Sequence, residues 1–212
     1  MNAREEILQR VREAKPASTK LRTADYLHIP RTYNQSGELP IESLLHLLTE
    51  RLEDYDAVVY RCSASGLPDT IAQAMDARGK TTLVAGASVP DAWLPAASKV
   101  VRDQGLTHGA LDESQGSLSG CAVAIAATGT IILAHRCGEA RRALTLIPDY
   151  HLCVVFAEQV VETVPEGFRR VAGHAEAPIT TISGPSATAD IEMTRIKGVH
   201  GPRSLDVILV VN

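Results

Sequence analysis

The sequence predicts an α/β protein in which a mostly parallel sheet is flanked by helices. Short β-branched runs recur along the chain, amphipathic helical segments alternate with the first of them, and the chain closes on another such run. With 212 residues, of which 45% are hydrophobic, the chain is long enough for one sizeable domain with an added arm.

The N-terminal part is predicted to be a helix followed by an extended arm. Residues 3–14 place three apolar side chains on one helical face. Residues 15–40 contain three prolines and little periodicity, which is typical of an extended segment. We therefore divide the chain into a helix and arm at residues 1–40 and an α/β domain at residues 41–212.

The domain is predicted to begin with a helix and then to alternate strands and helices. Residues 41–55 carry a leucine-rich apolar stripe, as expected of an amphipathic helix. A strand at residues 57–62 precedes a helix at residues 67–80, which has a proline near its start and a glycine at its end. Strands at residues 81–86 and 99–103 follow. This alternation is the mark of a parallel sheet.

The segment from Cys121 to Ala134 is apolar almost throughout and allows two interpretations. It could form one long buried helix, or two strands joined by a tight turn at Thr128-Gly129-Thr130. The β-branched residues after this break, and the glycine within it, favour two strands.

The C-terminal third continues the pattern. Residues 150–157 are predicted to form a buried strand, and residues 158–173 a helix that is interrupted at Pro165. Residues 179–183 and 205–211 are predicted to be the last two strands.

Composition argues against several classes of protein. A formal net charge of −4 and an aromatic content of 4% disfavour a nucleic-acid partner. No apolar run approaches the roughly 20 residues that span a bilayer, and the charged N-terminus does not resemble a secretory signal. The four cysteines are far apart and form no Cys-x-x-Cys pair, so we expect reduced thiols in a cytoplasmic protein and no metal site.

Four segments together resemble the LUD domain family, and within it the lactate utilization proteins. They are AIAATGTIIL, PDYHLCVVFAEQVV, TISGPSATADIE and GVHGPRSLDVILV, and the resemblance extends from about Leu44 to the C-terminus. It implies a fold like that of ribose-5-phosphate isomerase, glucosamine-phosphate deaminase and the CoA transferases. It also implies a cofactor-free part in oxidising L-lactate to pyruvate, beside two partner proteins that carry iron–sulfur clusters.

One position departs from the family pattern. Many relatives have an acidic residue two positions before the glycine of the Thr-Gly-Thr turn, where this chain has Ala127. If that carboxylate is a catalytic base, this chain lacks it, so whether the chain is itself an enzyme stays open. The alternative function is a free-standing enzyme or binding protein for a phosphorylated or CoA-linked small molecule, which rests on fold analogy.

Two turns are candidate binding elements for a small anion. In Thr128-Gly129-Thr130, the glycine permits close backbone approach and the hydroxyls can donate to a phosphate or carboxylate. Ser183-Gly184-Pro185-Ser186 follows a predicted strand and precedes a predicted short helix, where backbone N–H groups can face an anion. The structural alternative is ordinary turn chemistry in the first case and helix capping in the second.

Asp190, Glu192 and His200 form a third candidate group. Two carboxylates and an imidazole can perform acid–base work or hold a divalent metal, but their spacing matches no known metal motif. The structural alternative is that Asp190 caps backbone groups and that Glu192 pairs with a nearby cation. We favour the structural role and predict no metal.

These groups lead to one prediction about location. Both turns follow β-branched strands, and parallel α/β sheets concentrate binding at the carboxyl ends of their strands. We therefore expect one cleft at that edge, lined by both turns together with Asp190 and His200 and oriented by Glu192. Nearby basic and histidine side chains are assigned to a solvated loop or to packing (Arg136, Arg141, Arg142, His135 and His151).

Overall fold

The computed structural model describes residues 3–14, 28–96, 99–135, 140–174, 177–185, 187–188, 196–198 and 200–211. It divides into two compact units at residues 1–33 and 34–212. The first unit contains helix α1 (Ala3–Ala14), in which no residue is buried. All other helices and strands of the described residues belong to the second unit. The boundary predicted after Pro40 stays a prediction. Within the described residues, no helix has the length and apolar character that crossing a membrane requires.

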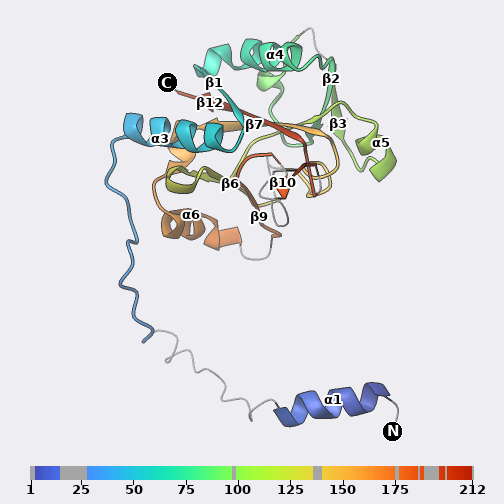
Figure 1. Ribbon diagram of the computed structural model, residues 1–212. Helices are drawn as coiled ribbons and strands as arrows, with labels where there is room; N and C mark the ends of the chain where they lie inside the picture. Colours follow the sequence, from blue (N-terminus) through green and yellow to red (C-terminus); the bar gives the residue numbers. More distant parts are fainter. Residues whose placement is uncertain are drawn as a thin grey trace. The chain divides into compact units, whose positions relative to one another are not determined.

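A six-stranded sheet forms the centre of the second unit, and every pairing in it is parallel (Figure 1). The order is β1-β12-β7-β4-β2-β3. The bounds are β1 (Val58–Cys62), β12 (Ser204–Val210), β7 (Tyr150–Phe156), β4 (Ser117–Ser119), β2 (Thr82–Gly86) and β3 (Lys99–Asp103). The predicted fold class is confirmed. Strand β4 was not predicted, because three residues that include two serines give no apolar run.

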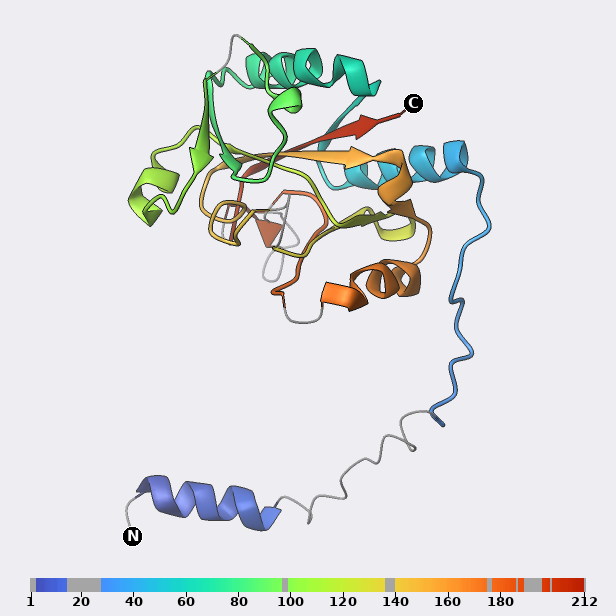
Figure 2. The ribbon, with the colours of Figure 1, turned by 180° about the vertical axis from the view of Figure 1, so that it is seen from behind.

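The last strand of the chain lies inside this sheet, between β1 and β7 (Figure 2). Its residues alternate between the two faces of the sheet, as strand geometry requires. Leu205, Val207 and Leu209 pack in one core cluster, and Ile208 and Val210 pack in another. Because both faces are covered, the strand reads as a continuous apolar run in the sequence.

A second, four-stranded sheet has the order β8-β5-β6-β9. Its strands are β8 (Val160–Val161), β5 (Val123–Ile125), β6 (Thr130–Leu133) and β9 (Thr180–Ile182). Strands β5 and β6 are antiparallel and are joined by a single 3-10 turn at Ala126–Thr128, which ends at Gly129 with a φ of 60°. The two-strand interpretation of this segment is therefore correct.

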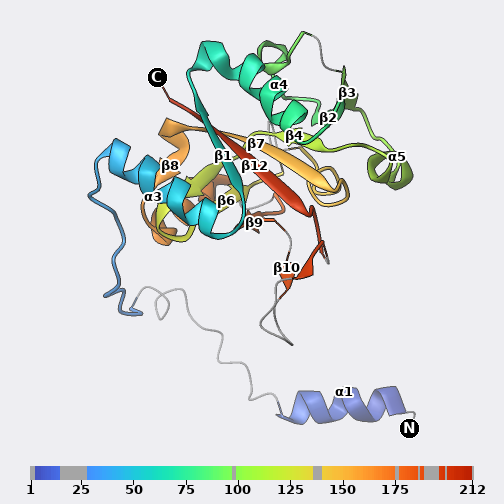
Figure 3. The same cartoon turned by 45° about the horizontal axis from the view of Figure 1, so that its top comes forward.

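Helices and sheets form layers (Figure 3). Helix α4 (Leu67–Ala77) covers one face of the six-stranded sheet through Leu67, Ile71, Ala74 and Met75. Helix α3 (Ile41–Asp54) and the four-stranded sheet pack on the other face, around a second core cluster. Helix α5 (His108–Asp112) begins at the Thr107 cap, near the edge of the six-stranded sheet.

One local prediction was wrong. The segment at residues 158–173 is not one interrupted helix: it contains β8 and then helix α6 (Val164–Val171), with Pro165 in the first turn of that helix. Glu166 accepts hydrogen bonds from the Thr163 backbone N–H and hydroxyl at 2.8 and 2.9 Å, which fixes the helix start. After Ser183, residues 187–188 form strand β10, paired with β11 (Ile196–Lys197). The rest of the short helix predicted there lies outside the described residues.

A buried carboxylate ties β12 to its neighbours. The Asp206 side chain is fully buried and accepts hydrogen bonds from Arg78 Nε and Nη2 at 3.2 and 2.6 Å, and from the Tyr150 hydroxyl at 3.0 Å. The hydrogen bond with Asp206 raises the pKa of Arg78, and burial, aided by the nearby carboxylate, raises the pKa of Tyr150. Both partners therefore keep their protons, and the carboxylate stays compensated.

We predict that Arg78→Met destabilises the protein strongly. The substitution leaves the Asp206 carboxylate buried without a cation, and such a loss costs about 3–5 kcal/mol. Urea denaturation measures the change in the free energy of unfolding. The matched control is Arg203→Met, which breaks an ion pair with Asp149 that is exposed on both sides and is expected to cost below about 1 kcal/mol. Similar small losses in both variants would contradict the prediction.

Candidate functional site: a pocket between the two sheets

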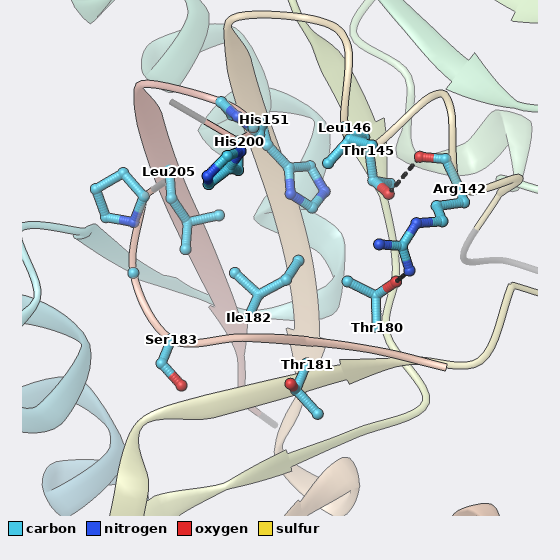
Figure 4. Close-up of a pocket in the computed structure, with 14 residues that line it drawn as sticks. Arg142, Thr145, Leu146, His151, Thr180, Thr181, Ile182, Ser183, His200 and Leu205 are labelled. Atoms are coloured by element: carbon cyan, nitrogen blue, oxygen red, sulfur yellow. Dashed lines mark hydrogen bonds between the residues drawn. The ribbon is translucent and has the colours of Figure 1, made fainter. Parts of the chain in front are cut away.

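A pocket of about 260 Å³ lies between the two sheets (Figure 4). It is lined by residues from the starts of β7 and β12, from β9 and from the loops beside them: Arg142, Thr145, Leu146, His151, Thr180, Thr181, Ile182, Ser183, Gly184, Pro185, His200, Gly201, Pro202 and Leu205. His151 and Leu205 are the second residues of their strands. This pocket is therefore at the amino ends of the central strands. The ligand cleft expected at their carboxyl ends stays a prediction.

Strand alternation brings His151 to this pocket. Its neighbours Tyr150 and Leu152 pack in the core cluster beneath α4, so His151 points to the opposite face of the sheet. His151 Nε2 lies 2.8 Å from Ser119 Oγ, and both side chains are buried. Burial lowers the pKa of His151 to about 4, so the imidazole is neutral at physiological pH.

Arg142 is held at the pocket by a series of hydrogen bonds. His135 Nδ1 lies 3.0 Å from the Ala140 carbonyl oxygen, which can only accept, so Nδ1 carries the hydrogen. Its Nε2 atom lies 2.7 Å from the Thr180 hydroxyl oxygen. The Thr180 oxygen in turn accepts from Arg142 Nη1 at 3.2 Å. This series of hydrogen bonds therefore holds the Thr180 hydroxyl beside the guanidinium.

The described residues that line the pocket include a cation and no carboxylate. Arg142 and Thr180 lie on one side and His200 and Leu205 on the other. Hydroxyl groups of threonine and serine add further hydrogen-bonding atoms to the wall. Among the described residues, no group of three potential metal ligands is present. Guanidinium and hydroxyl groups are donors that pair well with carboxylates and phosphates.

The two turns singled out in the sequence meet in the structure. Thr130 Oγ1 lies 2.8 Å from Thr128 Oγ1 and 2.9 Å from Ser183 Oγ, because β6 and β9 are antiparallel neighbours. The turns do not line one cleft, however. Ser183 and Gly184 line the pocket with His200, whereas Thr128 borders a separate hollow beside the end of α3. Ser186, Asp190 and Glu192 lie outside the described residues, and their predicted roles stay predictions.

Both turn glycines pack against the end of α3. A Cβ on Gly129 would lie 2.8 Å from Arg51 Cβ and 3.0 Å from the Arg51 carbonyl oxygen. A Cβ on Gly184 would lie 2.5 Å from Tyr55 Cβ and 2.6 Å from the Tyr55 carbonyl oxygen. Both glycines also have positive φ angles, of 60° and 80°. Close packing on the helix end therefore accounts for these glycines without a ligand.

Sequence reasoning missed the polar centre of the pocket. It assigns Arg142 to a solvated loop and His151 to packing, and it does not single out Thr180. The His151 side chain is buried, as predicted for a packed histidine, but it also lines the pocket. A usable signal existed: residue 151 interrupts the apolar run of a buried strand at its second position, where a side chain can reach the strand end.

We predict that Gly184→Ala destabilises the protein by about 2 kcal/mol or more. A residue with a Cβ atom must then adopt a positive φ, and the new methyl group must displace the end of α3. Thermal and urea denaturation measure the loss. Gly109→Ala is the control: no atom lies within 4 Å of its Cβ position and the residue is helical, so a neutral or slightly stabilising effect is expected. Equal effects of the two substitutions would show that the contact with Tyr55 is unimportant.

Comparison with known proteins identifies the family. Residues 45–210 match the model of the LUD domain. A lactate utilization protein C from Deinococcus radiodurans is 48% identical over 181 residues, which are 84% of each chain. A lactate utilization protein C from an Exiguobacterium species is 27% identical over 98% of this chain and 95% of its own. The crystal structure of a DUF162 family protein from Deinococcus radiodurans has a TM-score of 0.72 at 40% identity, and the match covers 82% of this chain and 100% of that one. The chain belongs to the LUD domain family.

Proposed function

We propose that the protein takes part in lactate utilization, as a component of a system that oxidises L-lactate to pyruvate. One observation carries this role: the 48% identity, over 84% of both chains, with a protein named lactate utilization protein C. Further relatives with the same name support it. We place the protein in the cytoplasm, where such a system meets its substrate.

In this proposal the chain carries no iron–sulfur cluster and acts beside partner proteins that do. Protein-bound clusters are held mostly by cysteine thiolates. The thiol of Cys153 donates to the Gly120 carbonyl oxygen at 3.7 Å, and that of Cys121 donates to Gln159 at 3.6 Å. Both cysteines are buried in the core, which is an ordinary packing role for this residue. Electron transfer is then left to the partners.

The second candidate is a free-standing enzyme or binding protein for a phosphorylated or CoA-linked small molecule. The Arg142 guanidinium, which among the described pocket residues meets no carboxylate, favours an anionic ligand of some kind. Growth on lactate separates the candidates, because only the first makes the protein specifically necessary for lactate.

We predict that deleting the gene abolishes or severely slows growth on L-lactate and leaves growth on pyruvate intact. Pyruvate enters metabolism after the oxidation step, so this pair of carbon sources isolates that step. Growth curves of the deletion strain and of a complemented strain measure the effect. Normal growth on L-lactate, in a strain without another lactate dehydrogenase, would exclude the proposed role.

We predict that helix α1 docks an iron–sulfur partner through its exposed apolar side chains. Ile7 and Val11 are 60% and 57% exposed, and this exposure is unusual for a stripe of this kind. Ile7→Asp with Val11→Asp should remove cluster-containing proteins from a pull-down of lactate-grown cells. Arg10→Gln, on a residue paired with Glu6, should leave the co-purified clusters unchanged. Retention of the clusters by the double variant would contradict the docking role.

A further inference from the structure

We propose that the pocket between β7, β9 and β12 binds a short-chain monocarboxylate, with Arg142 holding the carboxylate group and the Nδ1 side of His151 donating a hydrogen bond to it. The carboxylate class follows from the pocket alone. The choice of lactate and pyruvate as probes rests on the function proposed above.

Arg142 presents its charge to the pocket. Its neighbour Arg141 donates to both oxygens of Asp103, at 2.6 and 3.1 Å. Within the described part of the chain, by contrast, Arg142 donates only to the Thr180 hydroxyl, which is neutral. Two adjacent arginines thus differ in kind: one is neutralised by a carboxylate of the protein, and the other is available to an anion. A guanidinium pairs best with a carboxylate or phosphate.

The direction in which Arg142 points is also set by the protein. The hydrogen-bond chain from the Ala140 carbonyl through His135 and Thr180 fixes one nitrogen of the guanidinium. The remaining N–H groups are then available to a ligand, and less side-chain freedom is lost when the ligand binds. Thr180 is in this respect a positioning residue for Arg142.

His151 offers a second, neutral donor. Its Nε2 atom has Ser119 as a partner, and no described residue is a partner of its Nδ1 atom. Among the described residues, every fully buried side-chain nitrogen or oxygen has a hydrogen-bond partner, so Nδ1 must reach the open space of the pocket. An anion there selects the tautomer with the hydrogen on Nδ1, because the Ser119 hydroxyl can rotate to donate to Nε2. The ring then donates to the ligand without carrying a charge.

The size of the pocket and its apolar wall restrict the ligand further. A volume of about 260 Å³ is below the roughly 300–1,000 Å³ of sites for drug-sized ligands, so the pocket suits a small ligand better than a whole CoA ester. Leu146, Ile182 and Leu205 give it an apolar wall that suits a short alkyl group. One arginine beside a neutral imidazole matches a monoanion better than a phosphate dianion, which needs more compensating charge.

Isothermal titration calorimetry of the full chain tests the proposal with L-lactate, pyruvate, propionate and inorganic phosphate. We expect saturable binding of at least one carboxylate and weaker binding of phosphate. Arg142→Gln should weaken the affinity about 10-fold or more, since a charge-assisted hydrogen bond is lost. Arg170→Gln is the matched control, because it removes the same charge from helix α6, where the guanidinium donates a hydrogen bond to the Glu158 carbonyl oxygen. This variant should leave the affinity unchanged.

Two further readouts separate these roles from a structural one. Thr180→Val should weaken binding in the wild-type background and have no further effect in Arg142→Gln, because it acts through Arg142. Titration with the carboxylate should shift the ring ¹⁵N signals of His151 toward the Nδ1–H tautomer. The proposal is overturned if no carboxylate binds at millimolar concentration, if phosphate binds more tightly, or if Arg142→Gln binds as well as wild type while its thermal stability is unchanged. Tight carboxylate binding combined with normal growth of the deletion strain on lactate would instead refute the lactate role alone.

Discussion

The buried carboxylate of Asp206 constrains the position of β12, and the pocket depends on that strand. A carboxylate in the core is tolerated only where it meets a cation and hydrogen-bond donors, and Arg78 and Tyr150 supply them from the end of α4 and from β7. A shift of β12 by one residue would turn this charge into the apolar cluster on the opposite face. The same register sends Leu205 to that face, where it forms part of the pocket wall, and sets the loop at residues 200–202 beside it.

The second wall of the pocket depends on the two glycine turns. Gly129 and Gly184 both press against the end of α3, and the hydroxyls of Thr130 and Ser183 join the turns to each other. Because α3 also packs on the six-stranded sheet, these contacts fix β9 at a defined distance from β7 and β12. The glycines thus shape the pocket from outside its polar centre, which is made by Arg142 and His151.

Much of the fold could be predicted because the strands of the parallel sheet are buried on both faces and read as β-branched runs. The tight turn at Gly129 was likewise predictable, since a glycine flanked by β-branched residues favours a turn between two strands. Strand β4 and the start of α6 were not, because a three-residue strand has too little pattern and Pro165 at a helix start resembles a helix break. The pocket at the amino ends of β7 and β12 was not foreseen, because the rule for parallel sheets does not consider a second sheet that packs on one face and adds β9 to the lining.

A carboxylate bound between these two sheets, at the amino ends of β7 and β12, is the central claim. A crystal structure of the protein grown with pyruvate tests it most directly. We predict that the ligand carboxylate lies against the Arg142 guanidinium, within hydrogen-bonding distance of His151 Nδ1, and that its methyl group faces the apolar wall that includes Leu205. Ligand density at the carboxyl ends of the strands, or on a surface away from Arg142, would contradict it.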